Sequence, residues 1–496
     1  MLSCKEDKNG LFEEMQASHT GLHFENRLED KELFNILYYL YYYNGGGVAV
    51  GDINNDGLPD LYFTANSKGN NKLYLNKGNF QFEDITQQAG VAGNADWASG
   101  VTMADVNGDG RLDIYVTVSS GHHNLTGHNE LYINNGDNTF TESAAQYGLA
   151  FSGMGTQAAF FDYDRDGDLD VYLLNHSQKP NANIVDTSAR RKFSDVSGDR
   201  LMRNDIATTG KFTDVSAEAG IYQSALGYGL GIAIADINHD GWDDIYVGND
   251  FHENDYLYIN LGNGRFAEAG KDYFGHYSRF SMGNDINDFN NDGLPDIITV
   301  DMLPPYEREL KTYGSDENPD TYKFKLIRHG YQHQYSKNCL QVNNGRGTPF
   351  SETALLSGVA ATDWSWAPLF ADFDNDGNKD LFVSSGIVKR PVDLDYVKFV
   401  SDLVASMASG TDMSKYDKQA IDQMPDGASH PYFYQGTGGL QFIDRSEEWG
   451  TAHLKGYFNG AAYADLNNDG KLDMVVNRLN GKALVLKNNH PDKYTL

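Results

Sequence analysis

The chain has 496 residues, of which 70 are acidic and 39 basic, giving a net charge of −31, and it contains only 2 cysteines. Nucleic-acid binding needs basic patches, so this charge balance argues against a nucleic-acid partner. No run of apolar residues is long enough for a transmembrane helix, which needs roughly 18 or more.

The N-terminal residues Met1-Leu2-Ser3-Cys4 resemble the end of a bacterial lipoprotein signal, in which the cysteine is acylated. The following Lys5-Glu6-Asp7 resembles the tag that directs some lipoproteins to the outer face of the outer membrane. We therefore predict a lipoprotein N-terminus and tether over residues 1–20, lipidation at Cys4 and a lipid-anchored location on the bacterial cell surface. A free thiol at Cys4 is the alternative. Cys339 then has no partner and is predicted to lie in the core.

A nine-residue pattern, Asp-x-Asp/Asn-x-Asp-Gly-x-x-Asp, dominates the rest of the chain. Its seven copies start at Asp52, Asp105, Asp162, Asp236, Asp288, Asp372 and Asp465. Oxygen ligands at alternate positions, a glycine for the sharp turn and a final carboxylate suit a hard cation such as Ca²⁺. An EF-hand would place a bidentate Glu at position 12, where the first copy has Phe63. Because each copy leads into a β-rich run, we predict metal-clamped β-hairpins.

Each hairpin is followed by a third short strand and by a fourth strand that begins with phenylalanine, as in residues 71–76 and 82–85. Four strands per repeat, at intervals of 52 to 93 residues, are typical of propeller blades. The sequence therefore predicts an all-β fold, a seven-bladed β-propeller over residues 21–496. The last repeat lacks a fourth strand, and we expect residues 21–26 to supply it and so remove an open sheet edge.

Three connections between the second and third strands are long, at residues 177–198, 302–337 and 387–430. Such connections lie on the propeller face opposite the Asp-rich loops, and insertions on a rigid scaffold are where binding is usually built. The third insertion, in blade six, is predicted to hold a small helix. Asp393 can cap this helix, apolar residues recur from Leu394 to Met407, and Gly410 can end it.

We expect the same face to carry aromatic, histidine and charged side chains that could contact a ligand. Exposed aromatics with carboxylates and amides suit a sugar ring. Core packing is the alternative for Trp364 and Trp366, and the histidines lack the spacing of a known zinc site. The candidate binding residues are Trp97, His122, His123, His128, Asp250, His252, Arg328, His329, His333, Trp364 and Trp366.

The Asp-rich loops and the Gly-rich segments before them, such as residues 45–52, resemble the FG-GAP/VCBS repeats of integrin-α-type seven-bladed propellers. The resemblance covers nearly all of residues 21–490. The closest likeness is to bacterial VCBS-repeat surface lipoproteins of the CRTAC1 type, in which an ASPIC/UnbV domain often follows; whether such a domain follows in this protein stays open.

This resemblance implies that each loop binds one Ca²⁺ through side chains at positions 1, 3, 5 and 9 and the backbone carbonyl at position 7. Seven Ca²⁺ ions would change the net charge from −31 to −17, so we expect folding to depend on the metal. The implied ligands are Asp52, Asn54, Asp56, Leu58 and Asp60; Asp105, Asn107, Asp109, Arg111 and Asp113; Asp162, Asp164, Asp166, Asp168 and Asp170; Asp236, Asn238, Asp240, Trp242 and Asp244; Asp288, Asn290, Asp292, Leu294 and Asp296; Asp372, Asp374, Asp376, Asn378 and Asp380; and Asp465, Asn467, Asp469, Lys471 and Asp473.

The predicted function is a noncatalytic, calcium-stabilised surface module. It would capture glycan or protein ligands, or act as an accessory lipoprotein of an outer-membrane transporter. Two alternatives are a polysaccharide lyase or other carbohydrate-active enzyme, and a cell-adhesion protein. A lyase could use Arg328 and His329, but no motif fixes those roles, and we assign no catalytic residue.

Overall fold

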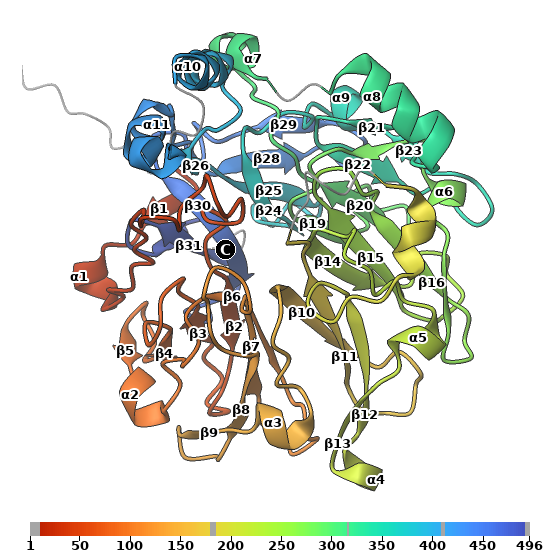
Figure 1. The fold of residues 1–496 in the computed structure, drawn as a ribbon. Coiled ribbons are helices and arrows are strands. Elements are labelled where there is room, and N and C mark those ends of the chain that lie inside the picture. The colour runs from red at the N-terminus through yellow and green to blue at the C-terminus, as the bar shows by residue number, and fades with distance from the viewer. Residues whose placement is uncertain (1–9, 179–184, 315–316, 408–411, 492–496) are drawn as a thin grey trace, which may run out of the picture.

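The computed structural model describes residues 10–178, 185–314, 317–407 and 412–491. Their strands form seven four-stranded antiparallel sheets that follow one another around a ring (Figure 1). The strands of the first four sheets are β2 (Val48–Gly51), β3 (Asp60–Phe63), β4 (Lys72–Asn76) and β5 (Phe82–Asp84); β6 (Ala98–Ala104), β7 (Asp113–Val118), β8 (Glu130–Asn134) and β9 (Phe140–Glu142); β10 (Gly155–Phe161), β11 (Asp170–Asn175), β12 (Arg200–Asp205) and β13 (Lys211–Asp214); and β14 (Gly229–Ala235), β15 (Asp244–Asn249), β16 (Tyr256–Asn260) and β17 (Phe266–Glu268).

The remaining three sheets complete the ring. They are β19 (Asn284–Asn287), β20 (Asp296–Thr299), β22 (Cys339–Val342) and β23 (Ser351–Glu352); β24 (Ser365–Ala371), β25 (Asp380–Ser385), β28 (Tyr432–Gly436) and β29 (Phe442–Asp444); and β30 (Tyr457–Ala464), β31 (Asp473–Leu479), β32 (Leu484–Asn488) and β1 (Phe12–Glu14). The first strand of each sheet in chain order contacts the first strand of the next, and β30 of the last sheet contacts β2 of the first. The predicted all-β propeller is therefore confirmed.

An N-terminal strand completes the last sheet, as predicted, but the strand is formed by residues 12–14, whereas the predicted residues 21–26 make only isolated bridges beside it. β1 pairs with β32, so that Phe12 lies opposite Asn488 and Glu14 opposite Leu486. Residues 21–26 lie beside the chain just before β32, where the carbonyl of Phe24 accepts a hydrogen bond from the N–H of Ala483 at 3.0 Å and Glu25 forms an isolated β-bridge with Lys482. The predicted tether over residues 1–20 was therefore too long. Residues 12–14 have the buried-then-exposed pattern of the other fourth strands, and Phe12 stacks on Phe433 of the neighbouring sheet with ring centroids 4.3 Å apart.

Within each sheet, the burial of the strands changes from the axis of the ring outward. The second strands β7, β11, β15 and β25 are buried at every residue, because side chains on both faces pack against neighbouring sheets. The outer strands alternate, beginning with a buried phenylalanine such as Phe82 or Phe140 followed by exposed residues. At some positions near the axis the backbones of neighbouring sheets approach closely. A Cβ on Gly283 would lie 2.0 Å from the carbonyl oxygen of Trp366 in the next sheet, which explains the Gly-rich inner strands.

Most helices are single turns at the rim of the ring. They are α1 (Ala17–Thr20), α2 (Thr86–Ala89), α3 (Ala144–Tyr147), α4 (Ile206–Thr209), α5 (Ser216–Ala219), α6 (Gly270–Tyr273) and α9 (Ala354–Ser357). No helix among the described residues is long and apolar enough to cross a membrane. Cys339 is buried, as predicted, whereas Cys4 lies outside the described residues.

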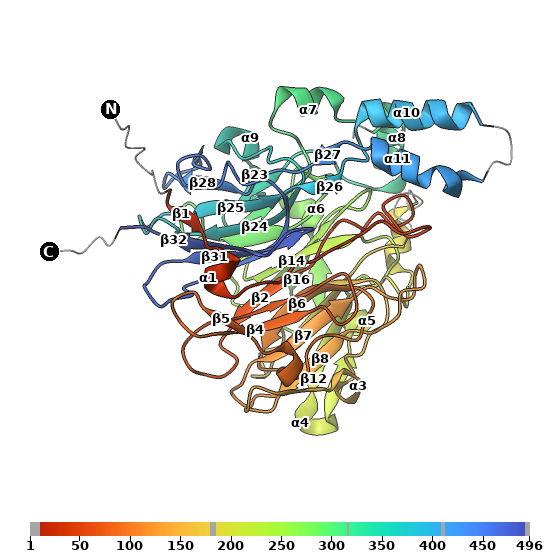
Figure 2. The same cartoon turned by 90° about the vertical axis from the view of Figure 1, so that its left-hand side faces the viewer.

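The long connections hold the other helices, which gather on one face (Figure 2). Their elements are η2 (Thr187–Arg191); α7 (Glu307–Thr312), α8 (Pro319–Phe324), the π-helical turn η3 (Lys325–His329) and β21 (Gln334–Tyr335), which pairs with β18 (Tyr277–Ser278); and β26 (Ile387–Lys389), α10 (Leu394–Ala405), η4 (Met413–Tyr416), α11 (Asp417–Gln423) and β27 (Asp426–Gly427). The predicted helix in the sixth sheet is confirmed as α10, capped by the Asp393 side chain. It ends at Ala405, and the predicted end at Gly410 lies outside the described residues.

Candidate functional site

Each Asp-rich loop connects the first and second strands of a sheet and folds around its own side chains. In the first loop, Asp52 accepts hydrogen bonds from the N–H of Asp56 at 3.1 Å and of Gly57 at 2.7 Å. Asp56 in turn accepts from the N–H of Leu58 at 2.9 Å. The bonds from positions 5 and 6 to the aspartate at position 1 recur in all seven loops. The seven copies therefore share one geometry.

Two positions in every loop adopt the left-handed backbone conformation. Position 6 is always glycine, with φ between 82° and 98°, where a Cβ would be strained. Position 4 has φ between 51° and 73°, and asparagine, which tolerates that region, is its commonest residue. The asparagine at position 4 also joins neighbouring loops, because Asn55 donates to the carbonyl of Gly110 at 3.2 Å and Asn468 to that of Gly57 at 3.0 Å.

The aspartate at position 9 starts the second strand and is buried. Asp60 is 0% exposed, and its carboxylate accepts from the N–H of Ile53 at 3.0 Å and of Asn76 at 2.7 Å. The Asn76 amide donates onward to the carbonyl of Leu466 in the neighbouring sheet at 2.9 Å. Each loop is thus anchored to the core and, through an asparagine, to the adjacent sheet.

This asparagine, at the end of the third strand, was not singled out from the sequence. We call it the asparagine tie. The sequence does contain a pattern that could have identified it, because an asparagine recurs at this place in six of the seven repeats: Asn76, Asn134, Asn204, Asn260, Asn343 and Asn488. The sixth sheet has Gly436 instead, whose N–H still donates to Asp380 at 2.9 Å but which has no side chain to reach the fifth sheet.

The carboxylates of the loops suit a divalent cation. In the third loop, oxygens of Asp162, Asp164 and Asp170 lie within 4.8 Å of one another, and Asp372, Asp374 and Asp380 are grouped in the same way in the sixth. Within the described part of the chain, Asp164 Oδ1 is buried without a hydrogen-bond partner. Burial and the neighbouring carboxylates raise the pKa of Asp170 to about 8. A cation would offset this crowding, and Ca²⁺ takes six to eight such oxygens. The loop residues therefore fit Ca²⁺.

The loops and the insertions lie on opposite faces. In an antiparallel sheet the turn between the first and second strands and the turn between the second and third strands are at opposite ends. The Asp-rich loops are all of the first kind, and the insertions that carry η2, α7 and α10 are of the second kind. One face is therefore uniform around the ring, and the other differs from sheet to sheet.

The three tryptophans that we expected to be exposed on the insertion face are buried, so that expectation was wrong. Trp97 is 1% exposed because residues 33–43 fold over it, with the rings of Phe34 and Tyr39 at 5.4 and 5.8 Å. Trp364 is 8% and Trp366 9% exposed, and Trp366 Nε1 donates to the carbonyl of Gly386 at 2.7 Å. Core packing, the alternative for these last two, is what the structure has.

The histidines predicted for the second sheet are near the same aromatic cluster. The rings of His122 and His123 lie 3.9 Å apart, and the ring of His123 lies 5.7 Å from that of Phe34. His128 Nδ1 lies 2.8 Å from the carbonyl oxygen of Asn129. These contacts are local, and they do not bring the three histidines to a shared site.

The remaining candidates lie under or within the insertion of the fifth sheet. Asp250 is buried, which raises its pKa well above the usual range, and His252 Nδ1 is 3.4 Å from Lys325 Nζ. His333 Nδ1 is 2.8 Å from the hydroxyl of Tyr322. Arg328 and His329 end η3. The predicted binding residues therefore form several separate groups.

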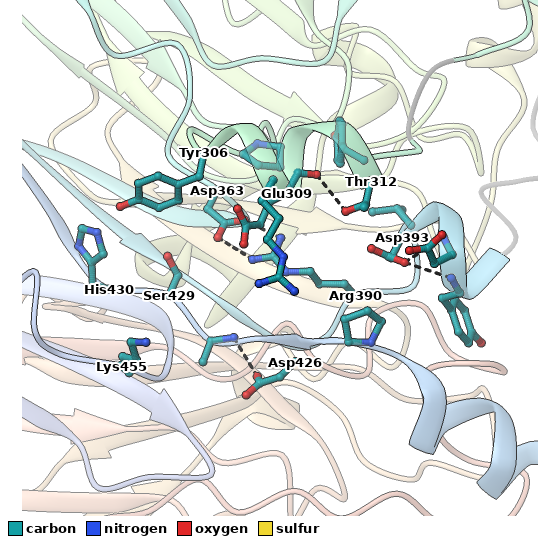
Figure 3. A pocket seen from close by; sticks show the side chains of 18 of the residues that line it. Tyr306, Glu309, Thr312, Asp363, Arg390, Asp393, Asp426, Ser429, His430 and Lys455 are labelled. Carbon is teal, nitrogen blue, oxygen red and sulfur yellow. Dashed lines mark hydrogen bonds and ion pairs between the residues drawn. The ribbon is translucent and has the colours of Figure 1, made fainter. Parts of the chain in front are cut away.

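A cavity of about 850 Å³ opens on the insertion face between the insertions of the fifth and sixth sheets (Figure 3). Its walls include α7 on one side and the start of α10 and the segment around β27 on the other. The two insertions are joined by a 2.9 Å hydrogen bond from the N–H of Gly314 to the carbonyl of Val392. None of the predicted binding residues lines this cavity.

An ion pair stands at the centre of the cavity. Arg390 donates to both carboxylate oxygens of Asp363, at 2.7 and 2.6 Å, and its guanidinium extends between Glu309 and Asp426 (Figure 3). Tyr306, at the start of α7, is 56% exposed. The sequence identified the two insertions, but their meeting point depends on tertiary contacts that no local pattern encodes.

Comparison with known proteins gives matches along much of the chain. A family model described as an FG-GAP-like repeat matches residues 52–116, 118–173 and 236–299. Cartilage acidic protein 1 of Xenopus tropicalis is 33% identical over 200 residues, which is 39% of this chain and 30% of that protein. The mouse protein of the same name is 24% identical over 364 residues, 68% of this chain and 48% of that protein. The chain thus spans about half or less of the length of these relatives.

Two solved structures resemble this chain in the path of the backbone over most of its length. An Agrocybe aegerita lectin, described as specific for non-reducing terminal N-acetylglucosamine, has a TM-score of 0.42 at 14% identity, with 90% of this chain and 95% of that chain covered. BBS1N in complex with ARL6DN has a TM-score of 0.44 at 9% identity, with 92% and 94% covered.

Proposed function

Because this chain is an FG-GAP-repeat β-propeller homologous to cartilage acidic protein 1, we propose that it is a calcium-stabilised binding module. Calcium would stabilise one face, and the cavity between the insertions would take the ligand on the other. The observation that carries the proposal is the shared geometry of seven loops with oxygen donors at every position that Ca²⁺ requires.

Calcium in this proposal acts on stability. Each loop would hold the ion through side-chain oxygens of positions 1, 3, 5 and 9 and the carbonyl of position 7. Since position 9 is hydrogen-bonded to the third strand, an ion bound there couples the hairpin to the core of its sheet. Binding to the folded chain alone raises its stability by mass action.

The test compares thermal unfolding of the full chain in excess Ca²⁺ and in excess EGTA, with Mg²⁺ present in both. We expect EGTA to lower Tm by about 10 °C and calcium to restore it. Mg²⁺ prefers near-ideal octahedral geometry with several waters, so it should not substitute. An unchanged Tm would refute structural calcium in this protein.

We also propose that Cys4 is lipidated and that the protein is anchored in the outer membrane, where it would act as an accessory subunit of a transporter. The sequence of residues 1–7 supports this part of the proposal. Metabolic labelling with an alkyne fatty acid in a bacterial host, followed by Cys4→Ala as the control, tests the attachment. The proposal expects label on the natural chain and none on the variant. Equal labelling of the two would remove this part of the proposal.

A further inference from the structure

We infer that the cavity between the two insertions binds a neutral carbohydrate, a ligand rich in hydroxyl groups and without net charge. The inference rests on the proposed binding function and specifies its ligand. The cavity volume of about 850 Å³ lies within the roughly 300–1,000 Å³ that is usual for small-molecule sites. It is large enough for more than one group of the ligand to be contacted at once.

The charge of the lining excludes an anionic ligand. Six acidic and three basic side chains line the cavity: Glu309, Asp363, Asp393, Asp395, Asp426 and Glu447 against Arg308, Arg390 and Lys455. Arg390 is already paired with Asp363 through two hydrogen bonds. A uronate, sulfate or phosphate group would therefore meet an excess of negative charge, and like charges brought together oppose binding.

A purely cationic ligand fits no better. The Arg390 guanidinium lines the cavity, with Lys455 and His430 along one side (Figure 3). An ammonium group could pair with a carboxylate of the lining, but it accepts no hydrogen bond, so the N–H groups of Arg390 and Lys455 would gain no partner from it. Polar groups left unpaired on binding lower the affinity.

Hydroxyl groups match the mixed lining, since each can donate to a carboxylate and accept from a guanidinium. Figure 3 shows this alternation, with Arg390 between Glu309 and Asp426 and with Ser429 beside His430. Tyr306 adds an exposed ring, and the apolar face of a sugar packs on such a ring. The donors are also fixed in place, because the Asp363 carboxylate holds the Arg390 fork in one orientation.

The experiment measures binding of the calcium-loaded full chain to an array of immobilised probes, followed by calorimetry on those that bind. The probes are neutral gluco-, manno-, galacto- and xylo-oligosaccharides, oligogalacturonates, heparin oligosaccharides and oligolysine. We expect binding to at least one neutral series and none to the anionic series. Tyr306→Ala should weaken binding about tenfold, whereas Tyr335→Ala should leave it unchanged, because Tyr335 is also an exposed tyrosine (47%) but lies outside the cavity.

The outcomes separate this inference from the proposed function. Binding of oligolysine or of an anionic series that Tyr306→Ala weakens would overturn the neutral ligand and leave the binding module intact. If a neutral oligosaccharide binds and its affinity is lowered by Tyr335→Ala but not by Tyr306→Ala, the ligand lies outside the cavity and the inference is overturned. Absence of binding to every probe would overturn the neutral-carbohydrate inference and leave a binding module for protein ligands, whereas an unchanged Tm on calcium removal would overturn the calcium-stabilised module.

Discussion

Replacing the asparagine tie Asn134 by alanine should destabilise the junction between the first and second sheets. The Asn134 amide donates to the carbonyls of Ile53 at 2.7 Å and Leu112 at 3.0 Å, and its oxygen accepts from the N–H of Gly136 at 2.9 Å. Asn134 is 2% exposed, so these groups lose partners in a place that water reaches poorly. At about 1 kcal/mol for each hydrogen bond, the variant should lose about 3 kcal/mol.

Thermal unfolding of the calcium-saturated chain measures this loss. With an unfolding entropy of about 2.1 cal/mol/K per residue, a chain of this length changes Tm by about 1 °C for each kcal/mol. Asn134→Ala should therefore lower Tm by about 3 °C. The neighbouring Asn135→Ala is the matched control, because its amide bonds the Thr139 hydroxyl at an exposed position. Equal Tm values for the two variants would refute the role given to the tie.

Two further predictions concern the loops and the outer part of the fifth sheet. Gly293 has φ 86°, where a Cβ is strained, so Gly293→Ala should lower the free energy of unfolding by about 1–2 kcal/mol. Gly439 has open space around it and no positive φ, so Gly439→Ala should leave the free energy of unfolding unchanged in the same assay. Equal effects of the two substitutions would show that backbone strain is not the cause. Burial opposes ionisation of Glu352, but hydrogen bonds from His276 and Lys337 outweigh it and lower its pKa from 4.5 to about 2. Since the folded pKa lies below the unfolded one, this contribution to stability is complete above pH 4.5 and is lost as the pH falls towards 2. Glu352→Gln should therefore be less stable than the natural chain at pH 6, with a difference that narrows towards pH 2, and a constant difference in urea unfolding at the two pH values would contradict it.

The periodic features of the fold could be predicted from the sequence because each repeat carries them locally. The nine-residue pattern places a turn, two glycine-compatible positions and the start of a strand, and these recur with the same hydrogen bonds in every loop. The capped helix α10 is equally local, since Asp393 accepts from the N–H of Asp395 and Tyr396 at 3.0 Å.

The features that failed depend on contacts between distant segments. The strand that closes the ring is β1 because Phe12 fits between Phe433 and Trp449, and residues 12–14 contain too short a pattern to show this. Trp97 is buried because the preceding aromatic segment folds over it. The cavity exists because Gly314 and Val392, in different insertions, meet. No repeating pattern in the sequence predicts any of these contacts.

Native mass spectrometry of the full chain, dialysed first against calcium and then against a volatile buffer, tests the central claim most directly. The account predicts a species carrying seven calcium ions, one for each loop, and a species with six for Asp162→Ala, which lacks the position-1 ligand of the third loop. A chain that carries no calcium, or the same number of ions with and without Asp162, would contradict it.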